Sequence, residues 1–167
     1  MNKIIITAIG TDKPGLVNKI TSIINDNNGN IDNSKMIKIE DQFAMIIEFS
    51  TSNKRIDIES KLNAIQDLKI YSKLVKDYDL LKKSTKTYLM IGADDQGIVN
   101  TISEYLEKNN INITEVDTFI EQAPTTGAPL FNMRVVIEYN KKSIDIHKIT
   151  KEIINLCEGL NLDAKLL

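Results

Sequence analysis

The chain repeats one segment. The run Ile9-Gly-Thr-Asp-Lys-Pro-Gly-Leu-Val-Asn18 returns as Ile91-Gly-Ala-Asp-Asp-Gln-Gly-Ile-Val-Asn100, an offset of 82 residues. The same offset relates residues 27–31 to residues 109–113 without a gap. Solenoid units are roughly 20–45 residues long, so this period instead indicates two tandem domains. We therefore expect domains at residues 1–82 and 86–167, joined by a brief polar linker.

Hydrophobic periodicity gives both halves the same order of elements. In the first half it predicts a strand, a helix, two hairpin strands, a helix and a strand, at residues 4–9, 16–24, 31–39, 43–49, 58–65 and 71–78. The second half repeats this order at residues 88–91, 98–106, 112–121, 130–139, 146–160 and 163–167. The β-α-β-β-α-β order predicts an α+β, ferredoxin-like fold, with one antiparallel sheet per domain and both helices on one face. The uncovered sheet face or edge needs a partner, which the second copy of the domain in the same chain can supply, edge to edge or face to face.

The halves differ in the connection between the hairpin strands. Phe43 aligns with Phe131, an offset of 88 instead of 82, so the second hairpin is six residues longer. The insertion, Glu121 to Leu130, contains the turn formers Pro124, Gly127 and Pro129. The sequence assigns this loop no role.

Composition excludes several classes of protein. The net charge is −2, the pI is near 5.5, and Arg55 and Arg134 are the two arginines, so direct binding of nucleic acid is not expected. No stretch approaches the roughly 20 apolar residues of a membrane span, and the protein is expected to be cytoplasmic. One cysteine excludes an intrachain disulfide, and one histidine excludes a two-histidine metal site. No metal and no cofactor are expected.

The residues that could do chemistry favour a protein that is not an enzyme. His147 lies on a helix expected to begin near Asp145, without orienting partners in the sequence. Cys157 falls on the apolar face of that helix, which indicates a buried structural thiol. The Gly10-x4-Gly15 spacing is that of a phosphate loop, but Leu16-Val17 stands where Lys-Ser/Thr is required.

The glycine loops suit a zwitterionic ligand better than a phosphate. Gly15 and Gly97 each precede a predicted helix, whose free backbone N–H groups attract a carboxylate. Asp12 or Asp94, three residues earlier, could accept an ammonium group. Equally, both aspartates could be plain helix caps, and Asn30 and Asn112 plain turn residues.

Two motifs carry a family resemblance. Asp12-Lys13-Pro14-Gly15-Leu16-Val17 with Asn30-Ile31 resembles the ACT domain signature, as does Asp94-Asp95-Gln96-Gly97-Ile98-Val99 with Asn112-Ile113. The resemblance covers essentially the whole chain as two tandem ACT domains. The stretch Thr126-Gly-Ala-Pro-Leu-Phe-Asn-Met-Arg134 is similar to a segment of the glycine cleavage system transcriptional repressor family.

The ACT resemblance implies that a small amino acid binds at an interface between ACT domains, held by the strand-to-helix loop and the start of the second strand. It implies a homodimer and these ligand-binding residues: Asp12, Pro14, Gly15, Leu16, Asn30, Ile31, Asp94, Gly97, Ile98, Asn112 and Ile113. Gln96 replaces the usual proline, so the second loop is expected to be less rigid and its site weaker.

Two functions follow from the resemblance. The repressor family implies a regulator of transcription that senses an amino acid and binds a transcription factor as its protein partner, without contacting DNA itself. The alternative is a regulatory subunit that controls an enzyme of amino-acid metabolism.

Overall fold

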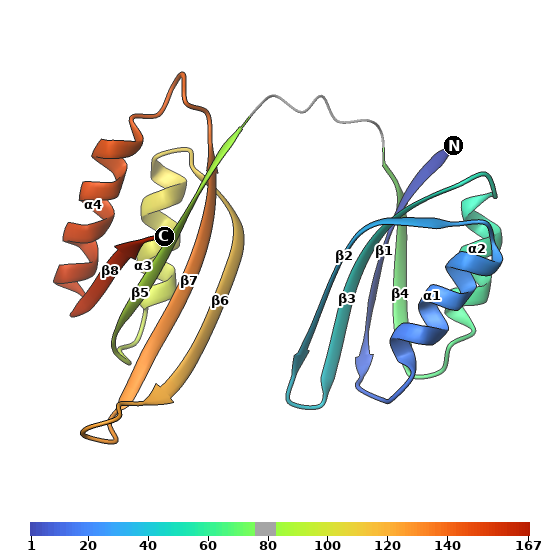
Figure 1. The fold of residues 1–167 in the computed structure, drawn as a ribbon, viewed down its shortest axis with the longest axis horizontal. Helices are drawn as coiled ribbons and strands as arrows, with labels where there is room; N and C mark the ends of the chain where they lie inside the picture. The colour runs from blue at the N-terminus through green and yellow to red at the C-terminus, as the bar shows by residue number, and fades with distance from the viewer. Residues whose placement is uncertain (76–82) are drawn as a thin grey trace. The chain divides into compact units, whose positions relative to one another are not determined.

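The computed structural model describes residues 1–75 and 83–167. Contacts divide the chain into two compact units, Met1–Asp79 and Leu80–Leu167. Each unit has the predicted β-α-β-β-α-β order, so the ferredoxin-like fold is confirmed (Figure 1). Of the polar run expected to link the domains, residues 82–86, residue 82 lies outside the described residues, and Ser84 to Lys86 belong instead to the strand Ser84–Ala93. No helix in the described ranges is long and apolar enough to cross a bilayer.

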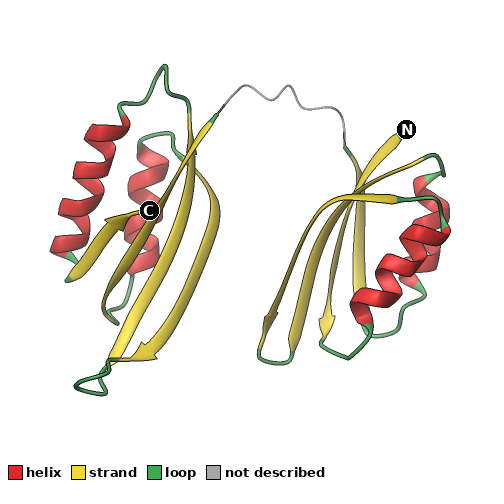
Figure 2. Cartoon of the chain, in the orientation of Figure 1, coloured by secondary structure: helices red, strands yellow, loops and turns green. Residues whose placement is uncertain are grey.

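The first unit is one antiparallel sheet with two helices on one face (Figure 2). Its elements are β1 (Asn2–Thr11), α1 (Leu16–Asp26), β2 (Asn30–Ile39), β3 (Gln42–Thr51), α2 (Arg55–Asn63) and β4 (Leu68–Leu74). The strand order β2-β3-β1-β4 makes β1 a central strand, as predicted. Ile4, Ile6 and Ala8 of β1 are buried in the core beneath the helices.

The second unit has the same architecture and the strand order β6-β7-β5-β8. Its elements are β5 (Ser84–Ala93), α3 (Ile98–Lys108), β6 (Asn112–Gln122), β7 (Pro129–Tyr139), α4 (Ile146–Gly159) and β8 (Leu162–Leu166). Its core is built from the inner faces of β5 and β7 and from the apolar stripes of α3 and α4.

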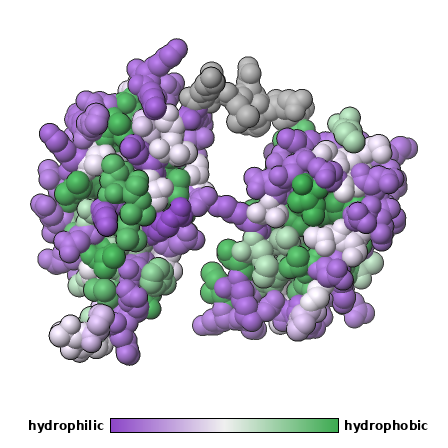
Figure 3. Space-filling view, in the orientation of Figure 1, coloured by the Kyte–Doolittle hydropathy of each residue, from purple (hydrophilic) through white to green (hydrophobic). Residues whose placement is uncertain are grey.

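Two strands of the first unit differ from the prediction. β4 begins at Leu68, three residues early, and residues 76–78 of the predicted strand lie outside the described residues. All ten residues of β2 are exposed, although the sequence alternates loosely between apolar and polar. The reason is that β2 is an edge strand that the helices scarcely cover. Met36, Ile37 and Ile39 therefore add to the apolar surface of this unit (Figure 3).

Helices α1 and α3 end in the same way. The left-handed residue is Asn28 in one unit, with φ 53°, and Asn110 in the other, with φ 54°. The next amide, of Gly29 or Ile111, donates to the carbonyl of Ile24 or Leu106 at 2.9 Å. Asparagine thus supplies the reversal in both units, and Gly29 is not the left-handed residue.

The first glycine of each repeated motif is required by packing. A Cβ on Gly10 would lie 2.0 Å from the carbonyl oxygen of Asp67, and one on Gly92 would lie 2.2 Å from that of Asn161. Gly10 pairs with Leu68 and Gly92 with Leu162, so each glycine admits the loop that enters the last strand of its unit. This close approach alone explains why a glycine recurs at this position, and no role in ligand binding is needed to account for it.

Candidate functional site

Helices α1 and α3 begin without a side-chain cap. Gly15 is the N-cap of α1, with φ 90° and ψ −2°, and Gly97 is that of α3, with φ 89° and ψ 2°. No side chain accepts a hydrogen bond at either cap. The alternative interpretation of Asp12 and Asp94 as plain helix caps is therefore wrong. Nothing lies within 4 Å of a Cβ built on either glycine. The space beside each N-cap glycine is therefore open; in the first turn of α1 the Leu16 amide donates to the Lys13 carbonyl at 3.4 Å.

The substitution of Gln96 for proline leaves this geometry unchanged. Pro14 precedes Gly15 and Gln96 precedes Gly97, yet the two N-cap residues differ by 1° in φ and 4° in ψ. Both Pro14 and Gln96 are exposed. The N-cap glycine of the second loop thus has the same backbone conformation as that of the first.

In the first unit, the loop is tied to the β2–β3 hairpin through Asp12. The Asp12 amide donates to the Asp41 carbonyl at 2.7 Å, and a carboxylate oxygen of Asp12 lies 2.8 Å from Nζ of Lys38. The Asp12 side chain is 23% exposed, so a ligand can reach it. Its carboxylate already has a cation beside it.

The corresponding aspartate in the second unit has no such cation. Lys38 pairs with Phe43 in the first sheet, and Ile120 pairs with Phe131 at the matching place in the second. Asp94 is exposed, and within the described ranges no ion pair engages its carboxylate. The second loop consequently offers the more available negative charge.

Two of the predicted site residues turn their side chains away from the loop surface. Leu16 is 4% exposed and Ile98 is 2% exposed, because both side chains enter the core. The residues that follow them, Val17 and Val99, are 38% and 41% exposed beside the loops. The helical spacing of the apolar residues over 16–24 predicts Val17 on the buried face, and its exposure corrects this prediction.

The other predicted residues lie at the opposite end of each sheet. Thr11 pairs with Gln42 at the loop end of β3, and Asn30 pairs with Ser50 eight residues further along. At about 3.3 Å per residue this separates Asn30 from the loop by roughly 26 Å, and Ile31 by roughly 23 Å. The Asn30 amide bonds to Asp32 at 3.2 Å.

The second unit repeats this separation. Ala93 pairs with Leu130 and Asn112 with Glu138, again eight residues apart on one strand. Within either unit, therefore, Asn112 and Ile113, or Asn30 and Ile31, do not meet the glycine loop.

The residues considered for catalysis are placed as predicted. Asp145 caps α4 by accepting from the amides of His147 and Lys148, and the His147 side chain is exposed. Cys157 is fully buried, and burial raises the pKa of its thiol to about 11. Among the described residues, no three His, Cys, Asp or Glu side chains gather where they could hold a metal ion.

Comparison with known proteins agrees with these motifs. A family model described as the ACT domain matches residues 2–70. A UPF0237 protein of Methanococcus maripaludis is 36% identical over 63 residues, which are 38% of this chain and 69% of that protein. The chain belongs to the ACT-domain family. The second ACT unit repeats the motif and the fold of the first.

Longer matches cover both ACT units. The glycine cleavage system transcriptional repressor of Escherichia coli is 25% identical over 168 residues, 98% of this chain and 88% of that protein. A crystal structure of a protein of unknown function from Galdieria sulphuraria shares the fold, with TM-score 0.87, 23% identity and coverage of 99% of this chain and 96% of that one. A protein provisionally named a glycine cleavage system transcriptional repressor has TM-score 0.70, 19% identity and the same coverages.

Proposed function

We propose that this tandem ACT protein is a regulator, not an enzyme, and that it senses a small amino acid at its glycine loops. The observation that carries the proposal is the uncapped start of α1 at Gly15, repeated in α3 at Gly97. Open backbone N–H groups at a helix start bind a carboxylate, aided by the positive end of the helix dipole. The ligand carboxylate sits there.

The ligand's ammonium group lies near Asp12 in the first loop and near Asp94 in the second. To bind the ammonium group, the Asp12 carboxylate must release Lys38 or contact both cations. The Asp94 carboxylate is exposed and has no ion pair to give up among the described residues. The shared N-cap geometry makes both loops competent. Stiffness alone therefore does not decide between the two sites.

Asn30, Ile31, Asn112 and Ile113 take part only through a different ACT unit. The roughly 26 Å between strand start and loop excludes a ligand that touches both within one unit. We therefore propose that these residues contact a ligand held by the loop of an ACT unit in a second chain, so that the protein acts as a homodimer.

The regulatory output is proposed to pass through a protein partner, a transcription factor. Its support is the likeness, over 98% of this chain, to a protein named a glycine cleavage system transcriptional repressor. The net charge of −2 and the two arginines disfavour direct contact with DNA. The partner, not this chain, would then read the operator.

Calorimetry on Asp12→Ala and Asp94→Ala tests the ligand assignment. Loss of a charge-assisted hydrogen bond costs about 1.5–3 kcal/mol, so each variant should weaken one class of site by about ten- to a hundredfold. Circular dichroism checks that both variants keep the fold. If the double variant binds glycine or serine as tightly as the unaltered protein does, these aspartates are not the ammonium contacts.

A further inference from the structure

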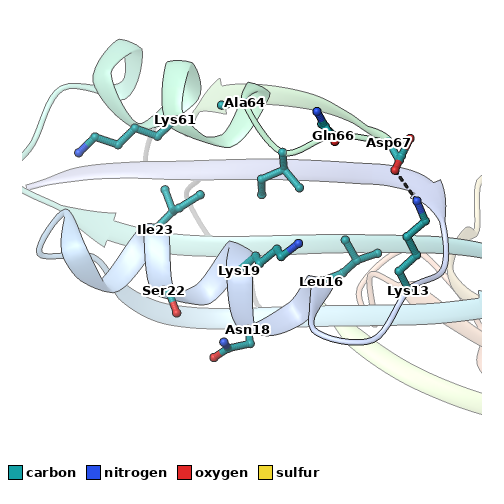
Figure 4. Close-up of a pocket in the computed structure, with 11 residues that line it drawn as sticks. Lys13, Leu16, Asn18, Lys19, Ser22, Ile23, Lys61, Ala64, Gln66 and Asp67 are labelled. Atoms are coloured by element: carbon teal, nitrogen blue, oxygen red, sulfur yellow. Dashed lines mark hydrogen bonds and ion pairs between the residues drawn. The ribbon is translucent and has the colours of Figure 1, made fainter.

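We propose that the groove between α1 and α2 of the first unit binds a small organic anion with two or more acidic groups. The groove has a volume of 710 Å³, within the usual range of small-molecule sites (Figure 4). It lies on the helical face of the unit, and its lining does not include Asp12. The groove adjoins the first glycine loop, since Lys13 and Leu16 line it, but the inference does not rest on the proposed function.

Three lysines follow the length of the groove. Lys13 lies near the start of α1 and makes an ion pair with Asp67. Lys61 donates to the side-chain oxygen of Asn27 at 2.8 Å, which places it at the other end of α1. Lys19 lies between them (Figure 4), and its ammonium group has no ion-pair partner in the described part of the chain. Helix α1 has 11 residues, so the cationic groups are spread over roughly 16 Å.

The floor of the groove is apolar. Leu16, Ile23 and Ile65 line it together with Ala64, and the first three are buried or half-buried. Three cationic side chains face one carboxylate, that of Asp67, in a chain whose net charge is −2. A cationic rim above an apolar floor fits an organic body carrying carboxylate or phosphate groups.

The second unit shows that the fold does not require this arrangement. By the 82-residue offset, Asp95 replaces Lys13, Thr101 replaces Lys19, and Tyr105 replaces Ile23. The Tyr105 hydroxyl donates to Glu152 at 2.7 Å and so bridges α3 to α4. Burial, followed by this hydrogen bond, raises the pKa of Tyr105 and keeps it a donor. The lysines at positions 13 and 19 are therefore not required by the repeated fold.

Titration of the full chain with citrate, and separately with pyrophosphate, tests the proposal by amide chemical shifts in ¹⁵N NMR. Sodium chloride at equal ionic strength is the reference, because surface charge effects are screened by salt. We expect saturable shifts at Ala64 and Gln66 with at least one probe. Saturation by citrate alone indicates a polycarboxylate, and saturation by pyrophosphate alone indicates a phosphate ligand.

Lys19→Gln should weaken the binding by roughly three- to tenfold, since one partly solvated cation is lost. Lys141→Gln is the matched control, because Lys141 is exposed in the second unit and outside the groove; it should leave the affinity unchanged. Binding of glycine should be the same in both variants. The proposal is wrong if the shifts do not saturate at millimolar probe, or if the two lysine variants lose affinity equally.

Discussion

Nζ of Lys38 lies 2.8 Å from Oδ2 of Asp12, so the carboxylate proposed to receive a ligand's ammonium group already has a cation beside it. The Lys38 side chain is 55% exposed, and ion pairs of such exposure contribute about 0–1 kcal/mol. A ligand can therefore displace Lys38 at little cost. In the second unit Ile120 occupies the matching place, and no displacement is needed.

Lys38→Met should strengthen binding of an amino acid at the first loop. Removing a competitor worth at most about 1 kcal/mol gives up to about a fivefold gain in affinity. Lys69→Met, at an exposed position on β4, is the control and should have no effect. Calorimetry distinguishes the two, and a loss of affinity in Lys38→Met would mean that Lys38 itself contacts the ligand.

Gly92→Ala should destabilise the second unit. Its Cβ would meet the Asn161 carbonyl oxygen at 2.2 Å, a backbone clash that needs a shift of the chain and costs about 1–3 kcal/mol. Gly159→Ala is the matched control, because nothing lies within 4 Å of its Cβ and alanine favours the helix. Urea denaturation should show a lower midpoint for the first variant and an equal or higher one for the second. Equal midpoints would show that the loop before β8 can move aside.

The stability of the second unit should fall at high pH in part through Cys157. Burial raises the pKa of this thiol from 9.0 to about 11, so the folded state retains a proton that the unfolded state loses. The contribution is fully present below pH 9 and is lost as the pH rises through 11, at most about 2–3 kcal/mol. Cys157→Ala should flatten the pH dependence between 9 and 11 relative to the unaltered protein. Parallel curves would contradict the raised pKa.

The purified chain should not bind duplex DNA at physiological salt. Affinity for DNA comes largely from neutralising phosphates, and this chain carries a net charge of −2 with two arginines. A fluorescence anisotropy titration at about 150 mM salt should show no sub-micromolar binding. Tight binding there would contradict the proposal that a protein partner, and not this chain, contacts DNA.

Much of the fold could be predicted from the sequence because apolar residues recur at regular spacing in both halves. Ile20 and Ile24 fall at helical spacing and are buried, as Ile102 and Leu106 are at the repeat offset. Cys157 was predicted as a buried thiol by the same pattern. The exposure of β2 could not be predicted from the sequence, because it depends on which strand lies at the sheet edge.

The candidate site was less predictable than the fold. Spacing indicates that Gly15 precedes a helix, but the pairing of Asp12 with Lys38 depends on the register of β2 against β3. Gly10 is required because the loop before β4 brings the carbonyl oxygen of Asp67 close to it. Such contacts join residues that are distant in sequence, so hydrophobic periodicity does not predict them.

The sensor proposal is tested most directly by calorimetric titration of the full chain with glycine, serine and the branched-chain amino acids. The uncapped glycine loops predict that at least one of them binds with a dissociation constant at or below about 1 mM, a binding free energy near −4 kcal/mol or stronger. The heat should shrink in the Asp12→Ala, Asp94→Ala double variant. If none of these amino acids binds at millimolar concentration, Gly15 and Gly97 are helix starts without a ligand, and the proposed function is wrong.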